Sequence, residues 1–416
     1  MPRPSQYRDG LTASSREPAS SSTPPQAPKL APVAELTDYR ARFPILAETT
    51  YLISHSLGPM PAEAERRLAE YAHSWNTRGA RAWGEGWWEL PMTVGDQVAR
   101  LIGAPPGSTV MHQNVTIAEA VVLSCFDFRG ERSRIVYEED NFPSVRYLQQ
   151  AQRAHGAEIV VCPDEEAIVA AIDERTLLVP ISHVIFKTGR IQEVEPIIRR
   201  AHDVGAYVVL DAYQSVGTVP LDVTALGVDF AVGGSVKWLC GGAGAAWLYV
   251  RSDLHERLEP TLVGWQAHMR PFAFEPDLEY AEGATRFLTG TPNVPALYAA
   301  TAGYDIVEEA GIDRIRANSV RQTKLLFGLL EEAGFDVVSP REPERRGGSV
   351  VVRTPDFEAV HAELDARDIL CDFRPEVGLR FGPHFFNTDE EIELAVSAVK
   401  EIVARGTTLP ASAGTG

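Results

Sequence analysis

Lys237 stands in a glycine-rich segment that follows an apolar run. It is one of only five lysines in the chain, and it follows the apolar run 229–232 inside the sequence Gly-Gly-Ser-Val-Lys-Trp-Leu-Cys-Gly-Gly. Glycines let a backbone approach a ligand closely. Desolvation in such a crevice lowers the pKa of an amine into the range where it is nucleophilic. The segment therefore predicts a Schiff-base lysine, and a lysine in a flexible surface loop is the alternative.

Asp211 comes directly after the apolar run 207–210. A carboxylate in that place is costly to bury without a cationic partner. The pyridinium nitrogen of pyridoxal phosphate (PLP) is such a partner, and a protonated ring serves as an electron sink. A helix N-cap is the competing interpretation. Asp211 and Lys237 each end a strand pattern, twenty-six positions apart, and as a pair they favour a PLP site.

Short apolar runs alternate with helical patterns through the middle of the chain. This alternation predicts an α/β fold with a mostly parallel sheet covered on both faces. Ligands bind at the carboxyl ends of the strands in such sheets. From about residue 297 the pattern changes to a smaller α+β unit with a long helix over 313–333. The predicted strands are 134–137, 158–161, 177–181, 207–210, 229–232 and 246–250, followed by 349–353 in the smaller unit.

The overall composition excludes several classes of partner. The chain has 416 residues and a formal net charge of -18, and an acidic surface repels both nucleic acids and anionic membranes. No run approaches the ~20 apolar residues of a membrane span, and the N-terminus lacks an apolar signal core, so we expect a cytoplasmic protein. Four cysteines without C-x-x-C spacing predict reduced thiols and no metal site. Residues 1–35 and 407–416 have the composition of disordered tails.

The sequence around Asp211 and Lys237 resembles class V aminotransferase-fold PLP enzymes, and further segments resemble the kynureninase branch. The resemblance implies the PLP-dependent transferase fold of type I, with a seven-stranded-type, mostly parallel sheet. It also implies an N-terminal segment at 36–60 that joins the small domain, a large PLP-binding domain at 61–295 and a small domain at 296–406. The segments that carry the resemblance are 211–217, 227–237, 51–61, 83–91, 141–144, 264–268, 286–292 and 380–383.

This resemblance implies roles for residues around the cofactor. Lys237 would hold PLP and Asp211 would pair with the ring nitrogen, while Phe142 would stack on the ring or else be a core phenylalanine. Val115 and Thr116 open a predicted helix over 117–125, where N–H groups can bind a phosphate; an N-cap is the alternative for Thr116.

Other implied contacts come from more distant segments. Ser235 and Trp265 match phosphate ligands of the family. Thr291 matches a residue that reaches the phosphate across a dimer interface, which implies a C2 homodimer. Arg380 matches the arginine that clamps the substrate carboxylate by bidentate hydrogen bonds. His55 would close over the substrate or be a plain loop histidine, and Arg374 is expected to be solvated.

Three positions depart from the kynureninase pattern. Val145 replaces an acidic residue, Gln214 replaces a histidine, and Val236 replaces the tyrosine before the lysine. Gln214 matches the Asp-Ala-x-Gln of cysteine desulfurases, where the amide donates to the phenolic oxygen of PLP. Loss of the tyrosine removes an acid/base group. No cysteine stands at an evident persulfide loop, which counts against a desulfurase.

These features lead to a first interpretation and its alternatives. We expect a PLP-dependent lyase acting at Cβ of an amino-acid substrate, with C–S β-elimination of a cysteine S-conjugate, as in antibiotic biosynthesis, as the favoured reaction. Kynureninase-type C–C hydrolysis is the alternative. A decarboxylating or transaminating enzyme on the same scaffold is a further class. A cofactor-less binding protein is a poor match to the retained Asp211, Lys237 and Arg380.

Overall fold

The computed structural model describes residues 35–406, so the predicted tails lie outside the described residues apart from Glu35. Its central sheet has seven strands in the order β2-β8-β7-β6-β5-β3-β4. Strand β8 runs antiparallel to β2 and β7, and the other neighbours are parallel. The prediction of a mostly parallel seven-stranded sheet is confirmed. The strands are β2 (Thr109–His112), β3 (Arg134–Glu138), β4 (Glu158–Cys162), β5 (Thr176–Ser182), β6 (Tyr207–Asp211), β7 (Phe230–Gly234) and β8 (Ala246–Val250).

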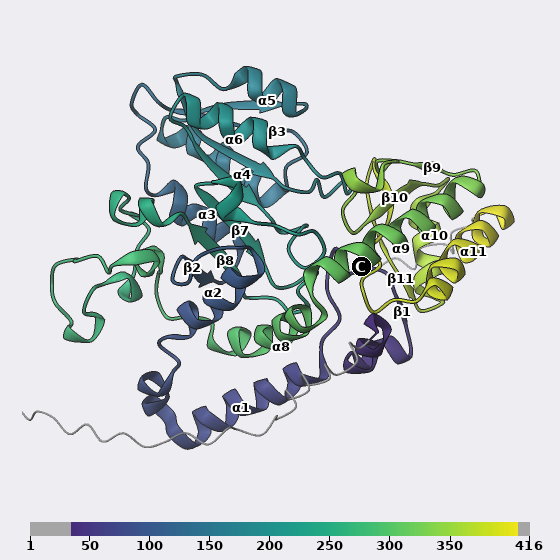
Figure 1. Cartoon of the computed structure of the whole chain (residues 1–416), viewed down its shortest axis with the longest axis horizontal. Coiled ribbons are helices and arrows are strands. Elements are labelled where there is room, and N and C mark those ends of the chain that lie inside the picture. The colour runs from purple at the N-terminus through teal and green to yellow at the C-terminus, as the bar shows by residue number, and fades with distance from the viewer. Residues whose placement is uncertain (1–34, 407–416) are drawn as a thin grey trace, which may run out of the picture. The chain divides into compact units, whose positions relative to one another are not determined.

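Helices cover both faces of this sheet (Figure 1). Successive residues of a strand point to opposite faces, so Val136 and Val179 belong to the core under α5 and α6. Their neighbours Ile135 and Leu178 belong to a second core, under α3. Burial on both faces explains why the strands are continuous apolar runs. The helices are α1 (Ala62–Arg78), α2 (Leu90–Leu101), α3 (Val115–Leu123), α4 (Pro143–Ala151), α5 (Glu165–Ala171), α6 (Val194–Asp203), α7 (Val223–Leu226) and α8 (Val294–Ala310).

A second, antiparallel sheet follows in the order β12-β13-β10-β9. Helices α9, α10 and α11 pack on it around a separate apolar core. The N-terminal segment contributes β1 (Thr50–Tyr51), which pairs in parallel with β11. The division into domains at residue 295 remains a prediction. The elements are α9 (Ile312–Glu332), β9 (Asp336–Val337), β10 (Val350–Arg353), α10 (Phe357–Asp365), β11 (Ile369–Leu370), β12 (Asp372–Arg374), β13 (Gly378–Phe381) and α11 (Asp389–Arg405).

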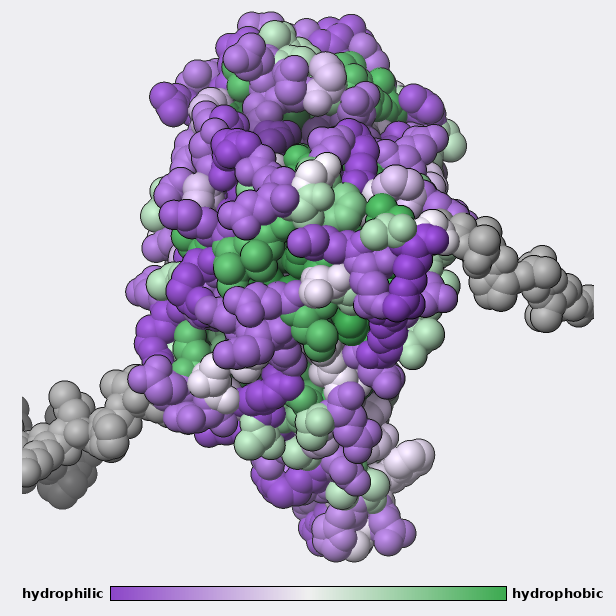
Figure 2. All heavy atoms as spheres, turned by 90° about the vertical axis from the view of Figure 1, so that its right-hand side faces the viewer, coloured by the Kyte–Doolittle hydropathy of each residue, from purple (hydrophilic) through white to green (hydrophobic). Residues whose placement is uncertain are grey.

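The surface beside α10 and α11 is mostly hydrophilic, with apolar side chains gathered near its middle (Figure 2). Across residues 35–406, no helix has the length and apolar character needed to cross a membrane.

Candidate active site

Asp211 and Lys237 meet at the carboxyl edge of the central sheet. Asp211 is the last residue of β6, and Lys237 follows the end of β7, the neighbouring parallel strand. A cavity of about 580 Å³ opens at this edge. It is lined by Asn114, Val115, Thr116, Ile117, Phe142, Ser144, Ser182, Val184, Phe186, Asp211, Tyr213, Gln214, Val236 and Lys237.

The Lys237 amine lies among aromatic rings. Its Nζ is 4.6 Å from the centroid of the Tyr213 ring and 5.4 Å from that of Phe142. Burial lowers the pKa of Lys237 to about 8, although the charge of Asp211 opposes this shift. A larger fraction of the amine is therefore neutral near neutral pH than for an exposed lysine, which suits a nucleophile or a base.

Asp211 is 7% exposed, and its Oδ1 accepts a hydrogen bond of 2.8 Å from the backbone N–H of Tyr213. Burial raises the pKa of Asp211, while this hydrogen bond and Lys237 act in the opposite direction. No helix begins at Asp211, so the N-cap alternative is wrong. The carboxylate is placed to receive a cation inside the cavity.

Helix α3 points its N-terminus into the same cavity. Asn114, and not Thr116, is its N-cap, and the Asn114 side chain accepts a hydrogen bond of 3.1 Å from the N–H of Ile117. The helix starts at Val115, two residues earlier than predicted. The N–H groups of Val115 and Thr116 have no partner within the helix, and such groups bind anions.

These groups fit PLP. A lysine amine, a buried carboxylate and a helix N-terminus line one cavity, which matches an aldehyde, a pyridine nitrogen and a phosphate respectively. Phe142, which lines the same cavity, also packs edge-on against Phe186, with 5.3 Å between ring centroids. Lys237, Asp211, Val115, Thr116 and Phe142 are the residues that would hold the cofactor.

Gln214 is 8% exposed and is anchored at both ends of its amide. Its Nε2 donates to the backbone oxygen of His55 at 3.0 Å, and its Oε1 accepts from Trp238 Nε1 at 3.3 Å. The amide nitrogen retains one N–H, which would be available to a bound cofactor.

Neither Arg380 nor His55 lines the cavity, but each is hydrogen-bonded to a residue that does, and the two share a partner. Arg380 Nε and Nη2 donate to the two carboxylate oxygens of Asp372 at 2.8 and 2.6 Å. His55 Nε2 is 2.9 Å from Asp372 Oδ1. The Arg374 side chain is 36% exposed and pairs with Asp372 at 3.0 Å, so it is partly solvated, as expected, and also belongs to this cluster. Antiparallel pairing of β12 with β13 assembles the cluster, because it sets Asp372 beside Arg380.

The other expected phosphate ligands do not line this cavity. The Ser235 hydroxyl is buried, donates to the backbone oxygen of Ala245 at 2.5 Å, and contacts the hydroxyl of Tyr304. Trp265 is 40% exposed and donates to the backbone oxygen of Pro271. Thr291 is exposed.

Sequence reasoning missed Tyr213. Its ring packs where Gly234 has no side chain, because a Cβ at position 234 would collide with the phenol. Burial raises the pKa of Tyr213 to about 12. Its position two residues after Asp211 was the available signal.

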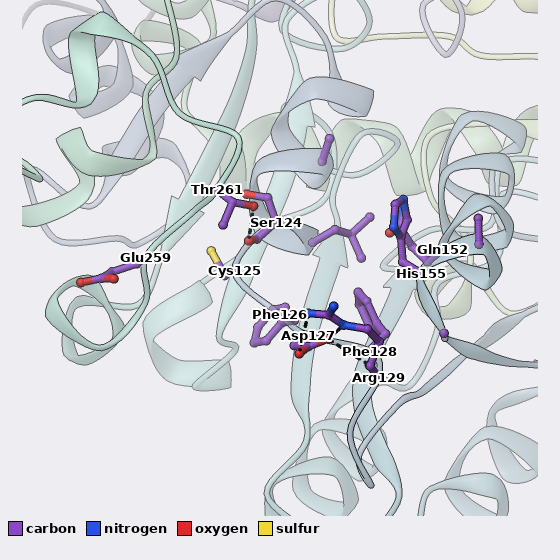
Figure 3. A pocket seen from close by; sticks show the side chains of 14 residues that line it. Ser124, Cys125, Phe126, Asp127, Phe128, Arg129, Gln152, His155, Glu259 and Thr261 are labelled. Atoms are coloured by element: carbon purple, nitrogen blue, oxygen red, sulfur yellow. Dashed lines mark hydrogen bonds and ion pairs between the residues drawn. The ribbon is translucent and has the colours of Figure 1, made fainter. Parts of the chain in front are cut away.

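A second, larger cavity of about 860 Å³ lies elsewhere, around the end of α3 (Figure 3). Two of its charged residues, Asp127 and Arg129, pair with each other at 2.8 Å. Burial raises the pKa of the Cys125 thiol to about 12, so this cysteine is a poor nucleophile. The Lys237 cavity is the better candidate for chemistry.

Comparisons with known proteins concern the chain as a whole. The sequence matches the aminotransferase class-V family model over residues 50–387. Kynureninase from Pseudomonas fluorescens is 32% identical over 390 residues, which cover 89% of this chain and 93% of that enzyme. Kynureninase from Bacillus anthracis is 31% identical over 397 residues, covering 89% and 92%.

Two solved structures show the same fold. An apo cysteine desulfurase from Thermococcus onnurineus NA1 has a TM-score of 0.78 at 23% identity, covering 88% of this chain and 98% of that one. The cystine C–S lyase C-DES, in complex with cysteine persulfide, has a TM-score of 0.78 at 21% identity, covering 86% and 99%.

Proposed function

Because the chain belongs to the aminotransferase class-V family and is a PLP-dependent enzyme, we propose that it breaks a bond at Cβ of an amino-acid substrate. The observation that carries the proposal is the meeting of Lys237 and Asp211 in one cavity with the N-terminus of α3. When bound, PLP supplies an electron sink for charge that develops at Cα.

The residues of the chain have distinct tasks in this proposal. Lys237 would hold the cofactor, and its amine would take the Cα proton, a task that its lowered pKa of about 8 suits. Asp211 would supply the negative charge that pairs with the ring nitrogen. Arg380 orients the substrate carboxylate, which sets the direction of the Cα–H bond.

Kynureninase-type hydrolysis of a C–C bond is the first candidate for the reaction. The kynureninases named above align with about nine tenths of this chain at 31–32% identity. This similarity outweighs the sequence-based preference for C–S elimination. Tyr213, whose phenol holds its proton because its pKa is about 12, is the hydroxyl we propose to act in place of the tyrosine missing at Val236.

C–S β-elimination is the second candidate, and Gln214 and Val236 favour it. Both residues line the cavity at positions where the kynureninase pattern has a histidine and a tyrosine. The structural similarity to a C–S lyase shows the fold alone. The setting in antibiotic biosynthesis stays a prediction from resemblance.

A product assay separates the two reactions. Holoenzyme is incubated with kynurenine and, separately, with a panel of S-substituted cysteines, and products are identified by mass spectrometry. Faster formation of alanine from kynurenine supports C–C hydrolysis. Pyruvate and ammonia from the cysteines support β-elimination, and carbon dioxide or a keto-acid requirement contradicts both. Lys237→Ala is the control and should be inactive in every arm.

We propose that the active unit is a homodimer. Trp265 and Thr291 do not line the Lys237 cavity, which suits ligands that serve a partner's site. Phe272 and Phe274 beside Trp265 are 55% and 74% exposed, and large apolar side chains of this kind mark association surfaces. Light scattering that finds a fully active monomer would contradict the proposal.

A further inference from the structure

Asp372 joins three basic side chains next to the candidate active site. It lies on β12 directly opposite Arg380 on β13. Its two oxygens accept the Nε and Nη2 hydrogen bonds of Arg380, contact His55 Nε2 at 2.9 Å and pair with Arg374 at 3.0 Å. His55 comes from the N-terminal segment, 317 residues away in the sequence. One carboxylate therefore connects the small sheet to the loop that carries His55.

The cluster keeps one positive charge at neutral pH. Burial, with the nearby charge of Arg380, lowers the pKa of His55 to about 4, so its ring is neutral. Two guanidinium groups then face one carboxylate. The contacts with His55 and Arg380 hold the pKa of Asp372 well below its usual range, although burial opposes this. An anion that enters beside Arg380 would neutralise the remaining charge.

The donors of Arg380 are arranged for one further ligand. A guanidinium has five N–H groups, of which Asp372 receives two and the backbone oxygen of Phe186 receives one at 2.7 Å. Two N–H groups remain. Phe186 also lines the Lys237 cavity, so its hydrogen bond ties the guanidinium to the wall of that cavity.

We propose that Asp372 is a positioning residue, which holds Arg380 and His55 so that the free N–H groups of Arg380 receive the carboxylate of an amino-acid substrate. This inference rests on the proposed function. Asp372 touches neither cofactor nor substrate in this role, and it acts through Arg380.

In the opposite role, Asp372 would occupy the N–H groups of Arg380 in the free enzyme and move away when the substrate carboxylate binds. The strand register argues against it, because Asp372 and Arg380 are fixed face to face by paired strands. Departure would also break contacts with three side chains, two of which are almost fully buried: His55 and Arg380 are each 1% exposed. Asp372 is therefore a permanent support.

The two roles predict opposite effects of Asp372→Asn, a change that also adds one positive charge to the cluster. If Asp372 only blocks Arg380, or acts only through its charge, the substitution would tighten carboxylate binding. If Asp372 positions Arg380, the substitution weakens it. The holoenzyme is titrated with L-alanine and with L-alaninamide, which lacks the carboxylate, and binding is followed by visible absorbance. We expect the dissociation constant for alanine to rise about tenfold or more, the effect of one misplaced charged hydrogen bond, and that for alaninamide to stay within about twofold.

Two further variants complete the test. Asp372→Glu keeps the negative charge, so the cluster stays balanced and the variant should fold. It displaces the carboxylate by one methylene group, so we expect the same selective weakening of alanine binding. Asp336→Asn removes an exposed ion pair with Arg353 in the same sheet and should change neither constant.

The outcomes separate this inference from the proposed function. Tighter or unchanged alanine binding in both Asp372 variants overturns the positioning role while the function stands. If the unaltered enzyme binds alanine and alaninamide equally, carboxylate recognition is absent, and both the proposed substrate class and the role of Asp372 are refuted.

Discussion

The stability of the Glu138→Gln variant, measured against that of the unaltered chain, should increase as the pH rises. Glu138 ends β3 and is 2% exposed. Its Oε1 accepts a hydrogen bond of 2.9 Å from the N–H of Ser182, while Oε2 is buried with no partner. Burial raises the pKa of Glu138 from 4.5 to about 8, and the negative charge of Asp211 acts in the same direction. In the folded protein Glu138 is therefore a neutral acid at pH 7.

The sign and size of the effect follow from this pKa. A group whose pKa is raised by folding stabilises the protein fully below its unfolded pKa, and this contribution is lost as pH rises through the folded pKa. For Glu138 the loss runs from pH 4.5 to about pH 8. At about 1.4 kcal/mol per pH unit, the loss between about pH 5 and pH 7.5 amounts to about 3 kcal/mol. Glutamine does not ionise, so the variant lacks this dependence of the free energy of unfolding on pH.

The assay is urea unfolding of the apoprotein, followed by circular dichroism at several values of pH. The free energy of unfolding of Glu138→Gln minus that of the unaltered chain should increase by about 3 kcal/mol from about pH 5 to pH 7.5. Glu139→Gln is the matched control, because Glu139 is exposed, and it should give a flat difference. A flat difference for Glu138→Gln would mean that Glu138 is ionised in the folded protein, and our account of the charges behind Asp211 would be wrong.

Three further substitutions test the site. Asp211→Asn should retain part of the cofactor, measured by visible absorbance, but lose roughly 100- to 1000-fold in turnover, because a buried cation loses its partner; normal turnover would remove Asp211 from the mechanism. Gly58→Ala should destabilise the protein by about 1–3 kcal/mol in thermal unfolding and lower its cofactor content, because the new methyl group would collide with the backbone oxygen of Lys237. Gly328→Ala, in open space on α9, is its control and should stabilise by up to about 1 kcal/mol. Thr291→Val should weaken PLP binding about tenfold in equilibrium dialysis while light scattering still finds the dimer, and unchanged affinity would refute a role for Thr291 at the phosphate.

The sequence alone predicted six of the seven strands of the central sheet, all but β2, and the Lys237–Asp211 pair. Strands buried on both faces are continuous apolar runs, and the predicted strand 246–250 coincides with β8. A charged residue at the end of such a run carries a large burial penalty unless it is paired and hydrogen-bonded, which is why Asp211 stands out. Both signals are local, because each depends on a few consecutive residues.

The short strands of the small sheet were beyond this kind of reasoning. Strands β9 and β12 have two or three residues each, which is too short for an alternating pattern. Sequence analysis found β10 in this sheet but missed β13, although both have four residues. Sequence analysis missed the ion pair of Arg374 with Asp372 because β12 was not recognised.

Tertiary structure decided what surrounds the pair. Asp372 acquires its role from the register of β12 with β13 and from a loop 317 residues away that delivers His55. The Tyr213 ring packs against a neighbouring strand at Gly234, which no local pattern of the 211–217 segment reveals. Hydrogen bonds and burial join residues by distance in space, whereas the sequence orders them along the chain. The residues proposed to hold the cofactor could therefore be predicted from two strand ends, while the positions of the groups proposed to orient a substrate depend on strand pairing and loop packing.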